Sequence, residues 1–370
     1  MKVKRLIAAS LSVLMVIGSL AACGSSGSSS TSTTAAAAPA ETTAAAATTA
    51  AAPAETKAAE PAADAKPVQF TINSGLVEMR DDVVKKFVND LSEKSGGRIK
   101  GQILEAGVMG SETESRQACI DGTITVSFNN VFNYAPMDWQ WLPGAFKDYD
   151  DVKKLAFDPE GEIWQYCIKA DEQAGLHMIG MLDNGFRYMA AVKEPLNTVD
   201  AITGAKVRIP NFPTVLDWYN NIQAIPAIID HSEVASGLQQ GMIAAADNAI
   251  YNYLSMGIQE MVHYITPTTV WGFGLMSVNK DFWDQLSPED QALFEEVGQD
   301  CSEFYLQYYQ DKTNEAVEKY TGNGTWEMCP PEDDLLARYE ECTEQTWKQY
   351  VESHPDQADW IATLSKVVGR

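Results

Sequence analysis

Strand-like and helix-like patterns alternate along the chain from residue 68 onward, and this alternation constrains the fold more than any other feature. Residues 68–72 alternate apolar and polar side chains, as a strand with one buried face does. They are followed by an amphipathic helical spacing over 84–91, a strand pattern at 99–104, a helix-capping motif at 111–114 and a third strand pattern at 124–128. This β-α-β-α-β order predicts an α/β fold with a mixed, mostly parallel sheet flanked by helices.

The alternation recurs in the second half of the chain. Strand patterns occur at 176–182, 187–192, 207–209, 225–229 and 270–278, and helical patterns at about 212–223, 232–240 and 250–263. Ser287-Pro288-Glu289-Asp290 is a strong helix start, and the helical pattern after it reaches about Tyr320. This predicts a long helix that either spans two lobes or breaks near Gly298.

The first 66 residues predict an export signal followed by a tether. A basic start precedes an apolar run from Leu6 to Leu20, as in a signal peptide over residues 1–22. Cys23 follows Leu20-Ala21-Ala22 directly, which resembles the lipobox of bacterial lipoproteins, where the cysteine is lipidated. No side chain between Gly24 and Lys66 is more apolar than alanine, so we expect a disordered tether over 23–66. The alternative is an ordinary signal peptide with an incidental cysteine.

Charge and motif content exclude several function classes. The formal charge is −24, and the first 66 residues hold five basic and four acidic side chains, which leaves −25 on the other 304. This acid excess argues against nucleic-acid binding and against docking on anionic lipid through protein charge. The four histidines are scattered, and the sequence has no P-loop, G-x-G-x-x-G, G-x-S-x-G or C-x-x-C motif. We therefore expect no metal and no cofactor.

Six segments resemble, in order, the substrate-binding proteins of TRAP (tripartite ATP-independent periplasmic) transporters of the C4-dicarboxylate-binding type. The first is KFVNDLSEKSGGRIKGQILEAGVMGSETESRQACIDGTITVSF at 86–128. The others are LPGAFKDYDDVKKL at 142–155, GFR at 185–187, AKVRIPN at 205–211, HSEVASGLQQGMIAAADNAI at 231–250 and VNKDFWDQLSPEDQALF at 278–294. Each motif is short, and their order and spacing carry the resemblance.

The resemblance implies two α/β lobes that close around an organic acid like a clamshell, with hinge strands and a long lobe-spanning helix. On this chain it predicts lobe I at 67–184 plus about 274–312, and lobe II at 185–273 plus about 313–370. Proteins of this type carry out no covalent chemistry and deliver their ligand to a TRAP permease. We therefore expect a monomeric, non-enzymatic receptor, held by its lipid on the outer face of the cytoplasmic membrane.

The resemblance also ranks the ligand-binding residues. Arg208 matches the family's carboxylate clamp, and a guanidinium can give a carboxylate two parallel charge-assisted bonds; the alternative is a structural ion pair. Arg187 matches a second position that contacts the acid, and its alternative is a salt bridge that stabilises the hinge. Asn248 matches the asparagine of the family's Gln-Glu-Asn-Pro motif, although the motif here is Ala246-Asp247-Asn248-Ala249.

Five further residues are candidates by position. Glu112, at a helix start, and Asn130, after the third strand, would read the far end of the ligand, although Glu112 could equally cap its helix. His231 stands where relatives often place an aromatic residue, and its alternative is helix capping. Asn211 lies close to the predicted clamp, and Trp271 is a candidate pocket wall, although such aromatic residues are more often core.

Three other functions stay open at this stage. A lipoprotein receptor for neutral sugars or peptides would serve an ATP-driven importer and would stack its ligands on aromatic rings. A ligand sensor for a histidine kinase would have the same fold and pocket. A surface-anchored hydrolase would need a catalytic group that no motif identifies. The sequence also leaves open whether Cys329 and Cys342 form a disulfide.

Overall fold

The computed structural model describes residues 66–73, 78–105, 107–131 and 134–370. The predicted signal peptide, Cys23 and the tether as far as residue 65 lie outside these residues. Within them, no helix combines the length and the apolar character needed to cross a bilayer. The five cysteines of the described part are all free thiols, so Cys329 and Cys342 are not joined.

The strands of the described residues form a single mixed sheet. They are β1 (Val68–Asn73), β2 (Ile99–Leu104), β3 (Val126–Asn130), β4 (Leu176–Ala191), β5 (Lys206–Ile209), β6 (Ile225–Ile228), β7 (Ala245–Ala249), β8 (Tyr264–Asn279) and β9 (Glu327–Met328). Their order is β2-β1-β3-β8-β4-β7-β5-β6, with β9 paired to β8. β1 is parallel to β2 and β3, and β5 is parallel to β6 and β7, whereas β4 and β8 are antiparallel to each other. The predicted α/β class with a mixed sheet is confirmed.

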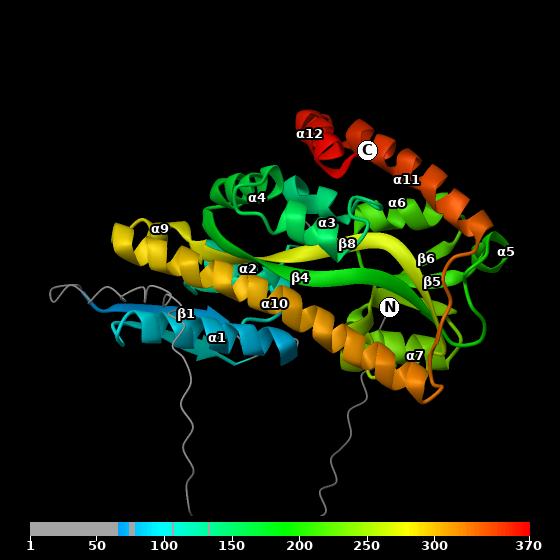
Figure 1. The fold of residues 1–370 in the computed structure, drawn as a ribbon, viewed down its shortest axis with the longest axis horizontal. Helices are drawn as coiled ribbons and strands as arrows, with labels where there is room; N and C mark the ends of the chain where they lie inside the picture. Colours follow the sequence, from blue (N-terminus) through cyan, green and yellow to red (C-terminus); the bar gives the residue numbers. More distant parts are fainter. Residues whose placement is uncertain (1–65, 74–77, 106, 132–133) are drawn as a thin grey trace, which may run out of the picture. The chain divides into compact units, whose positions relative to one another are not determined.

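Helices cover both faces of this sheet (Figure 1). The longer ones are α1 (Glu78–Lys94), α2 (Glu112–Ile120), α4 (Glu162–Gln173), α6 (Pro213–Asn221), α10 (Pro288–Gly322), α11 (Asp333–Ser353) and α12 (Ala358–Val368). The shorter ones are α3 (Tyr149–Asp151), α5 (Val199–Ile202), α7 (Val234–Gln239), α8 (Ile250–Ser255), α9 (Lys280–Trp283), η1 (Ala135–Trp141), η2 (Val152–Ala156), η3 (His231–Glu233) and η4 (Pro355–Gln357). The helix predicted over 250–263 is wrong beyond Ser255, because Gly257 turns the chain with φ 67°.

Strands β4 and β8 form one long antiparallel ladder through the middle of the sheet. The prediction of two strands at 176–182 and 187–192 is wrong, because β4 is continuous and the ladder absorbs the interruption as bulges between Asp183 and Tyr188. Gly185 lies in this irregularity with φ 77°, and a Cβ there would lie 2.7 Å from the Tyr309 ring. β4 and β8 therefore connect the β1–β3 side of the sheet to the β5–β7 side.

Helix α10 is unbroken over 35 residues, so the alternative of a break near Gly298 is wrong. Ser287 caps its start by accepting a hydrogen bond from the Asp290 N–H. Gly298 instead allows the helix to approach β4, since a Cβ there would clash with the backbone oxygen of Ile179. Figure 1 shows α10 running beside β4.

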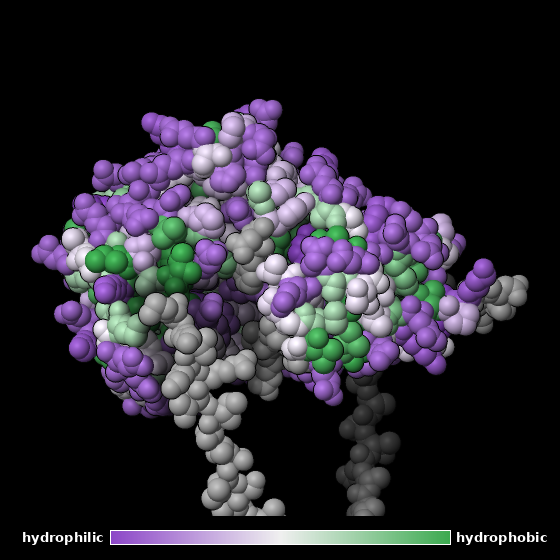
Figure 2. All heavy atoms as spheres, turned by 180° about the vertical axis from the view of Figure 1, so that it is seen from behind, coloured by the Kyte–Doolittle hydropathy of each residue, from purple (hydrophilic) through white to green (hydrophobic). Residues whose placement is uncertain are grey.

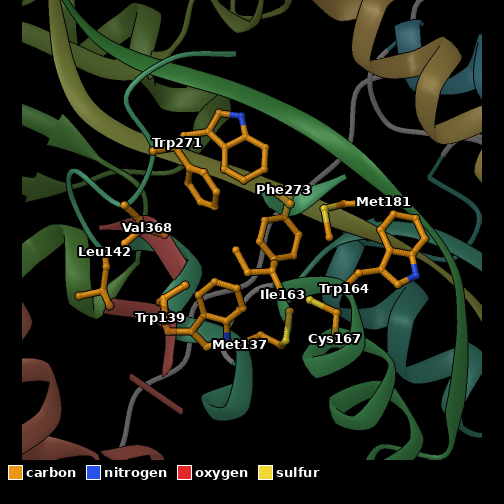
Figure 3. Close-up of a cluster of buried hydrophobic side chains, with 14 of the residues drawn as sticks. Met137, Trp139, Leu142, Ile163, Trp164, Cys167, Met181, Trp271, Phe273 and Val368 are labelled. Atoms are coloured by element: carbon orange, nitrogen blue, oxygen red, sulfur yellow. The ribbon is translucent and has the colours of Figure 1, made fainter. Parts of the chain in front are cut away.

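Neighbouring residues of β4 point into different core clusters, because successive strand residues face opposite sides. Met178 and Met181 pack with residues of η1, α4, β8 and α12, while Ile179 and Leu182 pack with residues of α1 and α10. Figure 3 shows the first of these clusters, in which side chains from η1, α4, β4 and β8 gather around Phe273. These cores on both faces fix the position of the central ladder.

Candidate functional site

The carboxyl ends of the parallel strands meet at the middle of the β4–β8 ladder. β3 ends at Asn130, which lies opposite Gly274 of β8, and Gly274 lies opposite Leu182 of β4. β7 ends at Ala249, opposite Arg187 of β4, and runs antiparallel to β4. The two sets of strands therefore point at each other, and ligands of α/β sheets bind outside such carboxyl ends. The irregularity at Gly185 lies between them.

The second set of strands brings two arginines and one aspartate together. Arg187 is buried and forms an ion pair with Asp247, with Nε donating to Oδ1 over 2.5 Å. Its Nη2 donates to the backbone oxygen of Asp247 over 3.1 Å, and Arg208 Nη1 donates to the same oxygen over 3.4 Å. The alternative for Arg187, a salt bridge, is thus present, and the two guanidinium groups are neighbours.

Arg208 has no acidic partner among the described residues. It is 4% exposed, and its Nε donates to the backbone oxygen of Ile229 over 2.8 Å. Its remaining nitrogen, Nη2, forms no hydrogen bond with a described residue. Burial and then the charge of Arg187 lower the pKa of Arg208 to about 10. The alternative of a structural ion pair is therefore not what the structure contains.

Asp247 accepts hydrogen bonds from protein groups on both oxygens of its carboxylate. Its Oδ1 accepts from Arg187 and its Oδ2 accepts from the Tyr219 hydroxyl over 2.7 Å. The Arg187 guanidinium also lies 5.7 Å from the ring centres of Trp141 and Phe212, which stack on each other at 4.2 Å. Arg187 is thus fixed on several sides, and the Asp247 carboxylate bonds to Arg187 and Tyr219, whereas Arg208 contacts only the backbone oxygen of Asp247.

The other predicted residues of this side lie nearby or at the surface. Asn248 is buried at the end of β7, and its Oδ1 accepts from Asn252 over 2.9 Å. His231 is exposed in η3 and does not cap it with a side-chain bond. Partial desolvation and then the charge of Arg208 lower the pKa of His231, which favours the neutral form of the ring. Asn211 is exposed at a bend after β5.

The first set of strands presents a different cluster. Glu112 forms an ion pair with the buried Arg80 of α1 and accepts from the Asn130 N–H over 3.3 Å. Arg80 Nη2 also donates to Asn130 Oδ1 over 3.2 Å. The alternative that Glu112 caps its helix is wrong, because Ser111 and Glu114 form the capping box of α2.

Trp271 belongs to the packed core. Its side chain is 1% exposed, and its Nε1 donates to Asp183 Oδ1 over 2.8 Å. Asp183 also accepts from the Gly185 N–H over 2.8 Å, at the irregularity of β4. Burial raises the pKa of Asp183 to about 7, although these hydrogen bonds oppose the rise. Trp271 therefore supports the central ladder from the core side.

Cavities of very different size lie near the end of the chain and beside Glu112. One of about 470 Å³ lies between Phe186, Thr268 and the end of the chain at Arg370, and none of the predicted site residues lines it. A small one of about 10 Å³ lies beside Glu112. Figure 2 shows a hollow in the surface with hydrophilic side chains in its depth. No cluster of three or more His, Cys, Asp or Glu in the described residues could hold a metal ion.

Sequence reasoning missed three members of these clusters. Arg80 lies among the charged residues at the start of α1, and a cation at such a position is normally solvated, so the sequence did not mark it as buried. Asp247 was visible as the acidic residue before Asn248, but its partnership with Arg187 depends on the register of β4 and β7. Tyr219 reaches Asp247 from α6, and no local signal marks it.

Comparison with known proteins identifies the family. A family model of bacterial extracellular solute-binding proteins, family 7, matches residues 78–354. The C4-dicarboxylate-binding protein DctB of Bacillus subtilis (strain 168) is 23% identical over 271 residues, or 72% of this chain and 76% of that protein. The C4-dicarboxylate-binding periplasmic protein DctP of Rhodobacter capsulatus is 24% identical over 259 residues, or 68% and 77% of the two chains.

Solved structures share the fold. A TRAP periplasmic solute-binding protein from Desulfovibrio desulfuricans, with bound sn-glycerol-3-phosphate, has a TM-score of 0.73 at 20% identity and covers 82% of this chain and 98% of its own. One from Sulfitobacter sp. NAS-14.1, with bound β-D-galacturonate, has a TM-score of 0.69 at 21% identity, with 80% and 98% covered. The predicted clamshell class is thereby confirmed. This chain belongs to the bacterial extracellular solute-binding proteins of family 7.

Proposed function

We propose that this protein is a lipid-anchored TRAP receptor that binds a small organic acid between two lobes and delivers it to a membrane permease. Lobe I comprises residues 67–184 and about 274–312, and lobe II comprises residues 185–273 and about 313–370. Cys23 carries the lipid on the outer face of the cytoplasmic membrane, and the segment after it is the tether. The receptor acts as a monomer and performs no covalent chemistry.

The ligands named for the relatives support an anion. Two curated relatives are named for C4-dicarboxylates. Solved relatives hold β-D-galacturonate, D-glucuronate, sn-glycerol-3-phosphate or orotic acid. These compounds differ in size and shape, but each is negatively charged at neutral pH. The shared requirement is therefore a cation in the site.

Arg208 is the observation that carries the proposal. A guanidinium that is 4% exposed and lacks an acidic partner leaves a charge that is costly in the free protein. Its neighbour Arg187 already uses Asp247, so the pair of arginines has a surplus positive charge. A ligand carboxylate would neutralise that charge and accept from the unused Nη2.

The spacing of the two clusters supports closure around the ligand. Asn130 is aligned, through β8, with Leu182 of β4, and Asn248 is aligned with Tyr188. Six residues of strand separate these positions, which is about 20 Å. This is a spacing between backbone positions, and the lobes would bring side chains of both clusters onto a small acid by bending at the irregularity around Gly185.

Arg208→Ala tests the proposal. We would screen the full chain by thermal shift against organic acids, neutral sugars and peptides, because a ligand raises the melting temperature by mass action. The variant should keep its fold and lose the two charge-assisted bonds, which are worth about 1.5–3 kcal/mol each, so affinity should fall about 100-fold or more. Arg338→Ala, on the half-buried side of α11, is the matched control and should bind as the wild type does.

Other outcomes separate the alternatives. Unchanged affinity in Arg208→Ala would refute the clamp. Stabilisation by neutral sugars or peptides, and by no acid, would favour a receptor for an ATP-driven importer. A permease gene beside this gene would favour delivery, whereas a histidine-kinase gene there would favour sensing.

A further inference from the structure

We infer that the ligand is a monocarboxylate whose far end is uncharged and hydroxylated, not a dicarboxylate. The inference rests on the proposed function, since it assumes that Arg208 holds the ligand's carboxylate. It follows from the charges at the two ends of the site.

At the Arg208 end one buried guanidinium lacks a directly bonded acidic side chain. Arg187 is ion-paired with Asp247, whereas Arg208 feels the charges of Asp247 and Asp230 but forms no ion pair with a described residue. Desolvation and the charge of Arg208 lower the pKa of His231, which favours its neutral form. Arg208 is therefore the one cation of this end that a ligand carboxylate can pair with directly.

At the opposite end the charge is already balanced. Arg80 is 3% exposed and pairs with Glu112, and its other terminal nitrogen donates to Asn130 Oδ1. Glu112 completes this cluster by accepting from the Asn130 N–H. Both terminal nitrogens of Arg80 are thus occupied, while its buried Nε has no hydrogen-bond partner among the described residues. The charge of Arg80 is already paired with Glu112, so a second carboxylate would find no unpaired cation here.

The small cavity beside Glu112 indicates what this end prefers. Its volume of about 10 Å³ is close to that of one water-sized group. It is lined by amide, hydroxyl and acidic side chains and by no lysine or arginine: Asn73, Glu105, Ser111, Glu112, Ser115 and Asn129, with two glycines and a methionine. Hydroxyl groups can donate to carboxylates and exchange hydrogen bonds with amides, whereas another carboxylate would meet like charge.

Closure of the lobes should strongly disfavour a ligand whose second charge has no partner. When the lobes close, water leaves the site, and a buried charge without a partner costs several kcal/mol. A monocarboxylate leaves none, because its one charge meets Arg208. A dicarboxylate of the same length would leave its second charge facing Glu112.

The test compares ligands of one carbon chain that differ in whether each end is a carboxylate or a CH2OH group. Gluconate, glucarate and glucitol share a hydroxylated six-carbon chain with one, two and no carboxylates; threonate, tartrate and threitol form the same series with four carbons. Titration calorimetry on the full chain should show the monocarboxylate binding at least tenfold tighter than the dicarboxylate in the series that fits, and the neutral polyol at least 100-fold weaker. Equal or tighter binding of a dicarboxylate would overturn the inference and leave the proposed function intact. Binding of no acid, in this series or in the thermal-shift screen of organic acids, would overturn the proposed function itself.

A change in ligand specificity would show whether Glu112 is the residue that rejects a second carboxylate. Glu112→Gln removes the negative charge and frees Arg80, so the ratio of dicarboxylate to monocarboxylate affinity should rise at least tenfold. Glu114→Gln is the matched control. It removes the same charge two residues further along α2, from an exposed side chain that takes part in the helix cap. An unchanged ratio in Glu112→Gln would contradict the role of Glu112. If that variant does not fold, the ligand series on the wild type still decides the ligand class.

Discussion

Replacing Asp247 with asparagine should destabilise the protein by about 3–5 kcal/mol, the cost of removing one partner of a buried ion pair. Arg187 is 2% exposed, so water cannot replace the lost carboxylate, and Arg208 would become its uncompensated neighbour. Arg187 would keep one bond, from Nη2 to the backbone oxygen at residue 247. The free-energy loss should therefore lie near the lower end of the range.

The expected shift in melting temperature follows from the size of the folded part. An unfolding entropy of about 2.1 cal/mol/K per residue over roughly 300 residues turns this loss into about 5–8 °C. Differential scanning calorimetry on wild type and variant would measure it. Tyr219→Phe is the matched control, because it removes one hydrogen bond to Asp247 and keeps the charge, at about 1–2 kcal/mol and about 2–3 °C.

A ligand experiment completes this test. Because a bound carboxylate would return negative charge to the two arginines, a saturating ligand should raise the melting temperature of Asp247→Asn more than that of the wild type. A variant that melts within 1 °C of the wild type would refute the reasoning, since Arg187 would then not depend on Asp247. A shift as large in Tyr219→Phe would assign the effect to the hydrogen bond from the Tyr219 hydroxyl and not to the charge of Asp247.

Two further predictions concern stability. Gly298→Ala should lower the free energy of unfolding, measured by chemical denaturation, by about 1–3 kcal/mol, because its Cβ would press on Ile179 of β4. Gly322→Ala is the control, since open space surrounds this glycine at the end of the same helix, and it should be neutral or slightly stabilising. Equal effects of the two substitutions would contradict the packing role of Gly298. The pKa of Asp183 is about 7 in the folded state and about 4 in the unfolded state, so the folded state binds the proton more tightly. The free energy of unfolding should therefore fall by up to about 4 kcal/mol as the pH rises from about 4 to 7. Asp183→Asn should flatten this part of the stability curve, and an unchanged slope would contradict the assignment.

Local patterns predicted the elements that depend on nearby residues. The Ser111 and Glu114 capping box and the Ser287 cap lie within single turns, so their sequences suffice to place α2 and α10. The interruption at Asp183-Asn184-Gly185 reads as a break because its residues favour turns, yet the ladder with β8 carries the strand through it. The pairing with β8, and not the local sequence, therefore makes β4 continuous.

The site could be predicted only in part, because its residues come from distant segments. The resemblance placed Arg187, Arg208 and Asn248 near one another, and the register of β4, β5 and β7 confirms their proximity. The ion pair between Arg80 and Glu112 joins α1 to α2 across 32 positions, and nothing in either helix specifies the other. The charge balance at the site could therefore be worked out only from the structure.

The continuous β4, β8 and α10 have a consequence for the evolution of this protein. Each of them carries residues of cores on both sides of the sheet's centre, so a cut in any of the three removes packing from both halves. Neither half can be excised and grafted as an autonomous module. New specificities in this lineage should therefore arise by replacement of individual residues at the strand ends, and not by exchange of lobes between paralogues.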